Sequence, residues 1–474
     1  MGSTATARVT PMQQSTASCV PLDLLKRFDV SGPRYTSYPT ADRLVEAFNA
    51  DTYADWVRKR TLAGMPRPVS LYFHIPFCES ICYYCACNKV VTKDHGRSAR
   101  YVKYLVRELE LVAELFDGPR NAIQMHWGGG TPNFLNTEEM RELVAGIRRH
   151  FTLDPRGEYS IEVDPRTIKE DTIPLLAELG FNRISMGVQD FDPVVQKSIN
   201  RIQSEDQTLG SIAAARANGF KSVNVDLIYG LPKQNVIGFN RTLERVIEAS
   251  PDRIALYNYA HLPTVFKPQR RIAESDMPTA DTKLQLLGLA IRRLTESGYA
   301  YIGMDHFARP DNELSVAQRQ GRLHRNFQGY STHADLDLFA FGISAIGQVG
   351  PTYSQNVKTL DEYYACLDHG TLPVMRGIEL TADDLLRRAL IQALMCHFEV
   401  PIESIEVAHL IDFRKYFEAE IRDLEPLREA GLLTLDDQYL TVTPLGRFFI
   451  RNICMVFDRY LREGRERARY SKVV

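Results

Sequence analysis

The chain has 474 residues, of which 44% are hydrophobic and 24% charged, and its formal net charge is −2 at pH 7. At roughly 100–200 residues per domain, this length allows two to four globular domains. The near-zero net charge excludes the strongly basic surface of a typical nucleic-acid-binding protein, and no polybasic run suggests binding to an anionic membrane. The most apolar stretch, residues 337–350, is too short for a membrane-spanning helix, which needs about 20 apolar residues.

The N-terminus and the cysteines bear on the cellular compartment. Residues 1–22 predict a disordered tail, because they are rich in Ser, Thr and Ala and lack the apolar core of a secretory signal. An organellar transit peptide would usually carry more than the one Arg found there. Of the eight cysteines, four are scattered singly and four are crowded into one loop. A disulfide framework would spread them evenly, so the pattern favours a reducing cytoplasm.

From residue 69 to residue 308, short apolar runs alternate with amphipathic helical stretches. Strand–helix–strand units repeated six or seven times predict a parallel sheet with right-handed crossovers. Because this falls short of a full eightfold barrel, we expect an α/β fold with a partial, about six-stranded TIM-like barrel whose site lies at the C-terminal strand ends. The predicted strands are residues 69–75, 122–128, 158–164, 183–189, 222–230, 253–260 and 299–308.

The pattern changes near residue 371. Residues 371–474 predict a mainly helical C-terminal domain with a winged-helix character, and residues 432–444 look like a small hairpin within it. At this net charge, we expect the winged-helix character to serve packing rather than nucleic-acid binding. We therefore divide the chain into a tail (1–22), an N-terminal covering segment (23–68), a barrel with its extension (69–370) and the C-terminal domain (371–474).

The loop after the first predicted strand concentrates the chemistry. The sequence from Phe73 to Lys89, FHIPFCESICYYCACNK, places four cysteines in a Cys-x3-Cys-x2-Cys-x-Cys pattern. Zinc ribbons usually use two separated Cys-x2-Cys pairs, and a thioredoxin-like motif needs only two cysteines. A compact group of thiolates instead suits an iron–sulfur cluster, with three corners held and the fourth iron open.

The three-cysteine spacing after a first barrel strand resembles the radical S-adenosylmethionine (SAM) superfamily. The resemblance narrows to oxygen-independent coproporphyrinogen III oxidases, also called coproporphyrinogen III dehydrogenases, and covers nearly the whole chain. It implies conversion of two propionates of coproporphyrinogen III into vinyl groups, giving protoporphyrinogen IX in haem biosynthesis. The segments that carry the resemblance are residues 32–40, 72–78, 87–92, 126–132, 160–167, 183–191, 224–232, 257–263 and 324–332.

The resemblance also implies the cofactors and their ligands. A 4Fe–4S cluster would be bound by Cys78, Cys82 and Cys85, and two SAM molecules would supply the two radicals that two decarboxylations need. An electron from the cluster would cleave SAM to methionine and a 5′-deoxyadenosyl radical. The residues implied at the two SAM sites are Tyr72, Tyr84, Gly129, Gly130, Thr131, Glu162, Gln189, Arg201, Asp226, Ala260 and Ile346.

Two of these assignments also have a physical basis in the sequence. The three glycines of residues 128–130 allow a close approach of backbone to a ligand, although a tight turn would explain them as well. Glu162 and Asp226 lie near strand ends in apolar runs, where a carboxylate needs a partner. A ribose hydroxyl or an ammonium group would serve, and a structural salt bridge to an Arg is the alternative.

The remaining expectations concern catalysis, substrate and partners. Tyr72 is expected beside the first SAM, and the fourth thiol, Cys87, is either a catalytic residue or a packing cysteine. Because coproporphyrinogen carries four carboxylates, Arg34 and Arg325 are candidate substrate-binding residues, with Tyr35 lining the cavity. We expect a cytoplasmic monomer that receives electrons from a reductant such as flavodoxin or ferredoxin.

Two other readings remain open at this point. Haem chaperones of the same superfamily share the three-cysteine motif and bind haem without oxidase activity. They usually lack the fourth cysteine and the segments PRYTSYPT and RNFQGY, all of which are present here. A zinc-binding loop on a barrel scaffold is the second alternative, but it leaves the glycine turn and the later segments unexplained.

Overall fold

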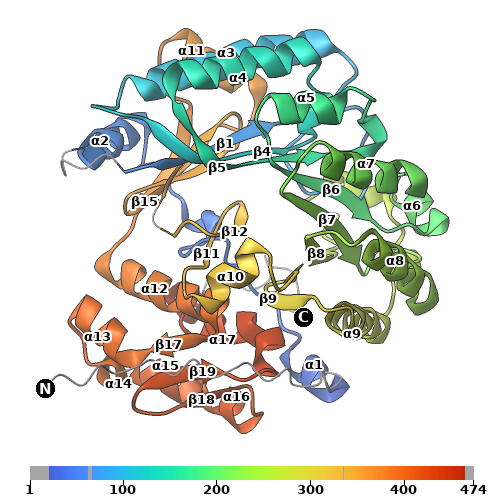
Figure 1. Cartoon of the computed structure of the whole chain (residues 1–474). Coiled ribbons are helices and arrows are strands. Elements are labelled where there is room, and N and C mark those ends of the chain that lie inside the picture. The colour runs from blue at the N-terminus through green and yellow to red at the C-terminus, as the bar shows by residue number, and fades with distance from the viewer. Residues whose placement is uncertain (1–20, 62–66, 335, 465–474) are drawn as a thin grey trace, which may run out of the picture.

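A twelve-stranded mixed sheet forms the centre of the fold (Figure 1). The computed structural model describes residues 21–61, 67–334 and 336–464. Apart from its last two residues, the tail predicted for residues 1–22 lies outside this range. Among the described residues, no helix combines the length and the apolar character needed to cross a bilayer.

Seven neighbouring strands of the sheet are parallel, and six of them were predicted. Their edges agree with the predicted ranges to within a few residues, apart from an early start of β5. The strands, in spatial order, are β13 (Asp337–Phe341), β1 (Val69–Ile75), β4 (Asn121–Gly129), β5 (Thr152–Val163), β6 (Arg183–Gln189), β7 (Ser222–Tyr229) and β8 (Arg253–Asn258). The partial α/β barrel expected from the sequence is therefore confirmed.

The edges of the sheet are antiparallel, and here one prediction is wrong. Residues 299–308 do not form a seventh parallel unit but a hairpin, β9 (Ala300–Gly303) and β10 (His306–Ala308), which pairs antiparallel with β8. The turn that breaks the segment contains Met304 and Asp305, both with positive φ. On the other edge, β14 (Ile346–Val349), β15 (Thr352–Asn356) and β16 (Val374–Glu379) form an antiparallel meander.

Alternation along the parallel strands gives the sheet two different faces. Leu71, Phe73, Trp127 and Ile161 are fully buried on the outer face, where the crossover helices pack. Residues between them, such as Tyr72, point to the inner face, because successive side chains alternate. The covering helices are α3 (His95–Ala113), α4 (Thr137–His150), α5 (Thr172–Glu178), α6 (Pro193–Ser198), α7 (Glu205–Ala217), α8 (Val236–Ala249) and α9 (Ala280–Glu296).

The start of α4 shows how local sequence sets these helices. Asn136 accepts a hydrogen bond from the backbone of Glu139, whose side chain accepts one from the backbone of Asn136. This reciprocal cap satisfies two N–H groups that would otherwise lack partners at the helix start. Both partners of this cap lie within four residues of each other, so the start of α4 is set by local sequence.

A second hydrophobic cluster lies under the open side of the barrel. The predicted hairpin is present, as β18 and β19 with β17 added. Since β16 still belongs to the large sheet, we place the start of this C-terminal unit at α12 rather than at residue 371. Its elements are α12 (Ala382–His397), β17 (Glu399–Pro401), α13 (Ile402–His409), α14 (Phe413–Tyr416), α15 (Glu418–Asp423), α16 (Glu425–Glu429), β18 (Leu433–Leu435), β19 (Tyr439–Val442), α17 (Ile450–Val456) and α18 (Arg459–Arg462).

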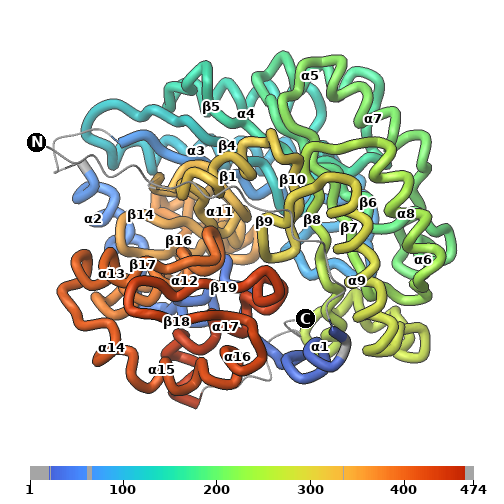
Figure 2. Tube along the Cα trace, turned by 60° about the horizontal axis from the view of Figure 1, so that its bottom comes forward, coloured from blue at the N-terminus to red at the C-terminus, as the bar shows by residue number. Residues whose placement is uncertain are grey.

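The N-terminal segment ties this unit to the barrel. Figures 1 and 2 both show α1 (Leu22–Phe28) between the C-terminal unit and α9. Phe28 packs edge-on against Phe449, with ring centroids 5.7 Å apart. Lys26 pairs with Asp281 at the start of α9 at 2.8 Å. Helix α2 (Ala50–Thr61) instead packs near the far sheet edge, beside β14 and β16.

Candidate functional site

The cysteine loop leaves the barrel directly after β1. It is closed at its base by two short parallel strands, β2 (Phe77–Cys78) and β3 (Val90–Val91). The backbone N–H of Val90 donates to the carbonyl of Pro76, and that of Thr92 donates to Cys78. Because these bonds hold the two ends together, the intervening residues form one compact loop at the C-terminal end of the barrel.

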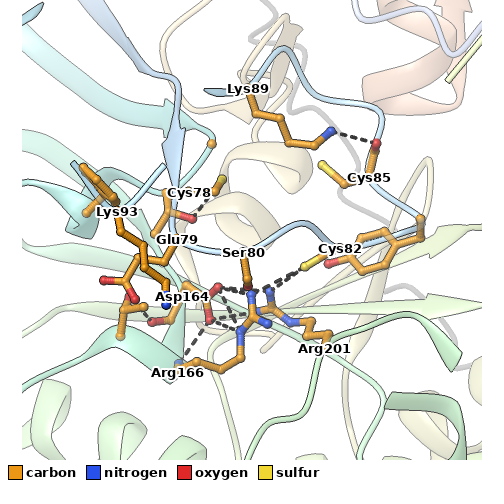
Figure 3. A pocket seen from close by; sticks show the side chains of 15 residues that line it. Cys78, Glu79, Ser80, Cys82, Cys85, Lys89, Lys93, Asp164, Arg166 and Arg201 are labelled. Carbon is orange, nitrogen blue, oxygen red and sulfur yellow. Dashed lines mark hydrogen bonds and ion pairs between the residues drawn. The ribbon is translucent and has the colours of Figure 1, made fainter. Parts of the chain in front are cut away.

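Three of the four loop cysteines border one cavity of about 280 Å³ (Figure 3). These are Cys78, Cys82 and Cys85, the three that the resemblance implies as ligands, whereas Cys87 is exposed and does not line the cavity. Thr131 Oγ1 lies 3.5 Å from the sulfur of Cys78, and Lys89 Nζ donates to the carbonyl of Cys85 at 3.0 Å. The remaining cavity-lining residues are Glu79, Ser80, Tyr84, Lys93, Gly130, Phe134, Asp164, Arg166, Thr167 and Arg201.

The thiols are arranged more suitably for a cluster than for a single ion. In the described part of the chain, no three His, Cys, Asp or Glu side chains are placed to hold one metal ion. A cubane makes a different demand, because each thiolate binds a separate iron and the sulfurs need not converge on a point. Three soft donors around a cavity of this size therefore fit a 4Fe–4S cluster.

The glycine turn after β4 packs against the same loop. A Cβ atom on Gly130 would lie 2.5 Å from the carbonyl oxygen of Pro76, and the Gly130 N–H donates to Ile75 at 2.8 Å. Gly129 has a φ of 117°, a conformation that favours glycine, and a Cβ there would lie 2.7 Å from the ring of His74. The close contacts of these glycines are thus with Pro76 and His74 of the protein itself, as a tight turn would require, and Gly130 also lines the cavity. The predicted approach of this backbone to a ligand stays a prediction.

Replacing Gly130 with Ala should destabilise the protein by about 1–3 kcal/mol, because the new methyl group overlaps the backbone at Pro76. Urea unfolding of the cluster-free protein would measure this loss. The matched control is Gly288→Ala in α9, where no atom lies within 4 Å of the added Cβ. That change should be neutral or stabilise the helix by up to about 1 kcal/mol. Equal stability of the two variants would contradict the close contact.

Glu162, at the end of β5, faces the inner side of the barrel. Its carboxylate accepts hydrogen bonds from the backbone of Gly129 at 3.2 Å and pairs with His126 Nε2 at 3.2 Å. Burial opposes ionisation, but the contacts with His126 and Gly129 outweigh it and hold the pKa of Glu162 below its usual range. His126 in turn stacks on the ring of Tyr72, with centroids 5.9 Å apart. Glu162 is therefore a fixed, ionised acceptor.

The pKa of Asp226, on β7, is shifted in the opposite direction to that of Glu162. It lines a second cavity, of about 150 Å³, which also includes Glu162, His306 and Tyr257. Burial, followed by the negative charge of Glu162, raises the pKa of Asp226 to about 7, although Ser185 and Asn224 donate to its oxygens. The buried carboxyl group of Asp226 therefore ionises much less readily than an exposed aspartate.

Of the other predicted SAM residues, some line the cysteine cavity and others line neither of the two cavities. Tyr84 and Arg201 line the cysteine cavity with Thr131. Gln189, Ala260 and Ile346 border neither of the two cavities; Gln189 is buried with a positive φ, and the carbonyl of Ala260 accepts a hydrogen bond from Gln269.

Of the predicted substrate residues, Arg325 is the one with buried hydrogen-bond donors that are not satisfied within the described residues. Its side chain is 5% exposed, and its Nε and Nη1 atoms have no hydrogen-bond partner among the described residues. It lies over the ring of Tyr330, 4.7 Å from the centroid. Burial, followed by the charge of Arg325, lowers the pKa of His306 to about 3. This region is therefore electropositive and rich in unpaired donors.

The other two substrate candidates are engaged within the protein. Arg34 donates to the carbonyl of Asn258 at 2.9 Å and lies 5.9 Å from the ring of Tyr257. Tyr35 is 1% exposed, and its hydroxyl donates to Asp458 in the C-terminal unit at 2.9 Å. The geometry supports Arg34 near the second cavity but gives no support to Tyr35 as a cavity-lining residue.

The sequence reasoning missed three residues of the site. His126 orients Glu162, and Asp164 and Arg166 line the cysteine cavity. All three lie within segments that carry the family resemblance, but the sequence did not show what these three side chains do. A role that consists of holding another side chain leaves no spacing pattern in the sequence.

Two family profiles and several known proteins are similar to this chain. The profile of the radical SAM superfamily matches residues 72–246, and that of the HemN C-terminal domain matches residues 380–449. The chain is 50% identical to the oxygen-independent coproporphyrinogen III oxidase of Pseudomonas aeruginosa and 47% identical to that of Escherichia coli. The alignments cover 95% and 96% of this chain and 98% of each relative. The solved structure of the Escherichia coli coproporphyrinogen III oxidase, described as a radical SAM enzyme, is similar with a TM-score of 0.88 and 46% identity, over 94% of this chain and all of that one.

Proposed function

The chain belongs to the oxygen-independent coproporphyrinogen III oxidases of the radical SAM superfamily, and we propose that it converts two propionates of coproporphyrinogen III into vinyl groups. The observation that carries this proposal is the cavity at the C-terminal end of the barrel, where Cys78, Cys82 and Cys85 face one space. The product would be protoporphyrinogen IX, an intermediate of haem biosynthesis.

The cysteine cavity would hold a 4Fe–4S cluster through these three thiolates. When bound, the cluster and SAM together supply a 5′-deoxyadenosyl radical, which removes a hydrogen atom from the substrate. The protein's own residues prepare the place for this chemistry. Gly130 lines the cavity, Thr131 lies beside Cys78, and Glu162 offers a fixed carboxylate.

We further propose two SAM sites rather than one. Gly129, Gly130, Thr131 and Glu162 would serve the first, with Tyr72 beside it. The second site would comprise Tyr84, Gln189, Arg201 and Asp226. Ala260 and Ile346 would contact the adenosine groups. The support is electrostatic. Glu162 and Asp226 line one cavity, and burial raises the pKa of Asp226, so a cationic or hydroxyl-bearing ligand would favour its charged form.

The substrate would lie over the inner face, with carboxylates toward the unpaired donors of Arg325 and toward Arg34. Hydrogen removal from the propionate carbon next to the ring would give a radical conjugated with the pyrrole. Loss of CO2 from this radical, with transfer of one electron to an external one-electron acceptor, leaves the vinyl group. No proton needs to be abstracted by a base. The side chain of Cys87 contacts that of Cys85 but is assigned no step in this chemistry.

Replacing Arg325 with Gln should weaken binding of coproporphyrin III, the stable oxidised analogue, about 10–100-fold. This loss corresponds to one charge-assisted interaction of about 1.5–3 kcal/mol. Fluorescence titration of the protein would measure it. The control is Arg322→Gln, because Arg322 is exposed and bonds only to Gln320 among the described residues. An unchanged dissociation constant for the Arg325 variant would remove Arg325 from the substrate site.

Anaerobic turnover of the reconstituted protein tests the function as a whole. With coproporphyrinogen III, SAM and a chemical reductant, CO2, 5′-deoxyadenosine and the divinyl product should appear together, with two deoxyadenosines per product. Stoichiometric binding of haem with no vinyl product would instead identify a haem-binding relative.

We also propose that the protein acts as a cytoplasmic monomer that is reduced by a flavodoxin or ferredoxin. Size-exclusion chromatography would check the oligomeric state, and reconstitution with the purified reductant would check the electron donor.

A further inference from the structure

Two guanidinium groups reach the sulfur of Cys82. Arg166 Nη2 lies 3.5 Å from the Cys82 sulfur and Arg201 Nη1 lies 3.6 Å from it, both within hydrogen-bonding distance of sulfur. Figure 3 shows the two side chains meeting this thiol from the same side of the cavity. Neither Cys78 nor Cys85 has an arginine contact among the described residues, so Cys82 differs from the other two predicted ligands.

One carboxylate holds both arginines in place. Asp164 pairs with Arg166 at 2.6 Å and with Arg201 at 3.2 Å, and Arg201 also donates to the carbonyl of Gly187 at 2.6 Å. Asp164 is itself fixed, because its backbone N–H donates to Asn133 at 2.9 Å and its side chain accepts from the backbone of Arg166. Burial opposes ionisation of Asp164, but the charges of Arg201 and Arg166 hold its pKa below the usual range.

The charges in this group do not cancel. Two guanidinium groups and one carboxylate leave a net charge of +1 beside Cys82, and Asp164 and Arg201 are 7% and 6% exposed. In such a place, water screens the charge weakly. Hydrogen bonds to a ligand sulfur and nearby positive charge both favour the state of a cluster that carries more negative charge, which is the reduced state.

We propose that Arg166 is a positioning residue that raises the reduction potential of the cluster by donating a hydrogen bond to Cys82. The inference rests on the proposed function, because it needs the cluster to be present. Arg166 rather than Arg201 carries the proposal, since the resemblance already gives Arg201 a role at the second SAM. With Arg166 in place, the cluster would accept an electron from a weaker reductant than it otherwise could.

A redox titration of the reconstituted full-length protein, monitored by electron paramagnetic resonance without SAM, tests this role. The midpoint potential of Arg166→Gln should be more negative than that of the unsubstituted protein. Arg166→Lys keeps the charge but loses the planar fork that binds both Asp164 and Cys82, so its potential should lie between the two. If the Gln variant assembles too little cluster to titrate, the Lys variant carries the test.

Lys93→Gln is the matched control, because Lys93 lines the same cavity but donates no hydrogen bond to the three cysteines. Its potential should shift less than that of Arg166→Gln. An unchanged potential for both Arg166 variants would overturn the proposal, and so would an equal shift for Lys93→Gln, since that result assigns the effect to general charge. Because the readout is a potential, an unsubstituted protein that makes no vinyl product would contradict the proposed function alone.

Discussion

Replacing Cys82 with Ser should give a folded protein that retains about one-tenth or less of the cluster iron and sulfide and forms no detectable vinyl product. The three thiolates each have a separate iron to bind, so the loss of one leaves a second corner open. A serine hydroxyl is a harder ligand with a much higher pKa, and Cys82 is buried beside Arg166 and Arg201. Iron and sulfide analysis, with the anaerobic assay, would measure both losses.

Cys366→Ser is the control for this prediction. Cys366 lies on α11 (Leu360–Asp368), does not line the cysteine cavity and is only partly buried. Its substitution should leave cluster content and turnover close to those of the unsubstituted protein. Full iron content in the Cys82 variant would end the assignment of Cys82 as a cluster ligand. Full activity as well would contradict the proposed mechanism, because its radical step depends on three bound thiolates.

The parallel strands could be predicted because each is a local pattern followed by its own crossover helix. The segment 299–308 has a similar composition, but a turn at Met304 and Asp305 folds it back on itself. β13 was missed for the complementary reason. β13 pairs in parallel with β1, but it follows the β11–β12 hairpin (His324–Asn326, Gly329–Ser331) rather than a helix. It therefore does not belong to a strand–helix–strand pattern that the sequence would reveal.

The features of the site likewise divide into local ones, which the sequence predicts, and contacts between distant residues, which it does not. The cysteine spacing and the glycine turn are local features, and the structure brings Cys78 and Gly130 to one cavity as expected. Tyr35 stands next to Arg34 in the sequence, yet its hydroxyl meets Asp458, 423 residues further along the chain. The contact of Arg166 with Cys82 likewise spans 84 residues. Partners of this kind depend on how the elements pack, and no pattern along the chain encodes them.

Replacing Asp226 with Asn should make the cofactor-free protein more stable at pH 8 while severely impairing product formation. The pKa of Asp226 rises from 3.8 to about 7 on folding. Between these values, the folded state holds a proton that the unfolded state has lost, so stability falls as the pH rises from about 4 to about 7. Asn does not ionise, so the variant avoids this loss, whose upper limit is about 4 kcal/mol at about 1.4 kcal/mol per pH unit.

The stability gain should disappear at low pH, which separates it from a general packing effect. Urea unfolding at pH 8 and pH 5.5 would measure the difference, and it should be clearly larger at pH 8. Glu162→Gln should change the stability in the opposite direction. The pKa of Glu162 lies below the usual range, so its charge stabilises the fold above about pH 4. The substitution should therefore lower stability at both pH values. Equal gains for Asp226→Asn at the two pH values would contradict the raised pKa. An inward carboxylate that costs stability without its ligand, and whose loss impairs product formation, would be retained for binding rather than for folding.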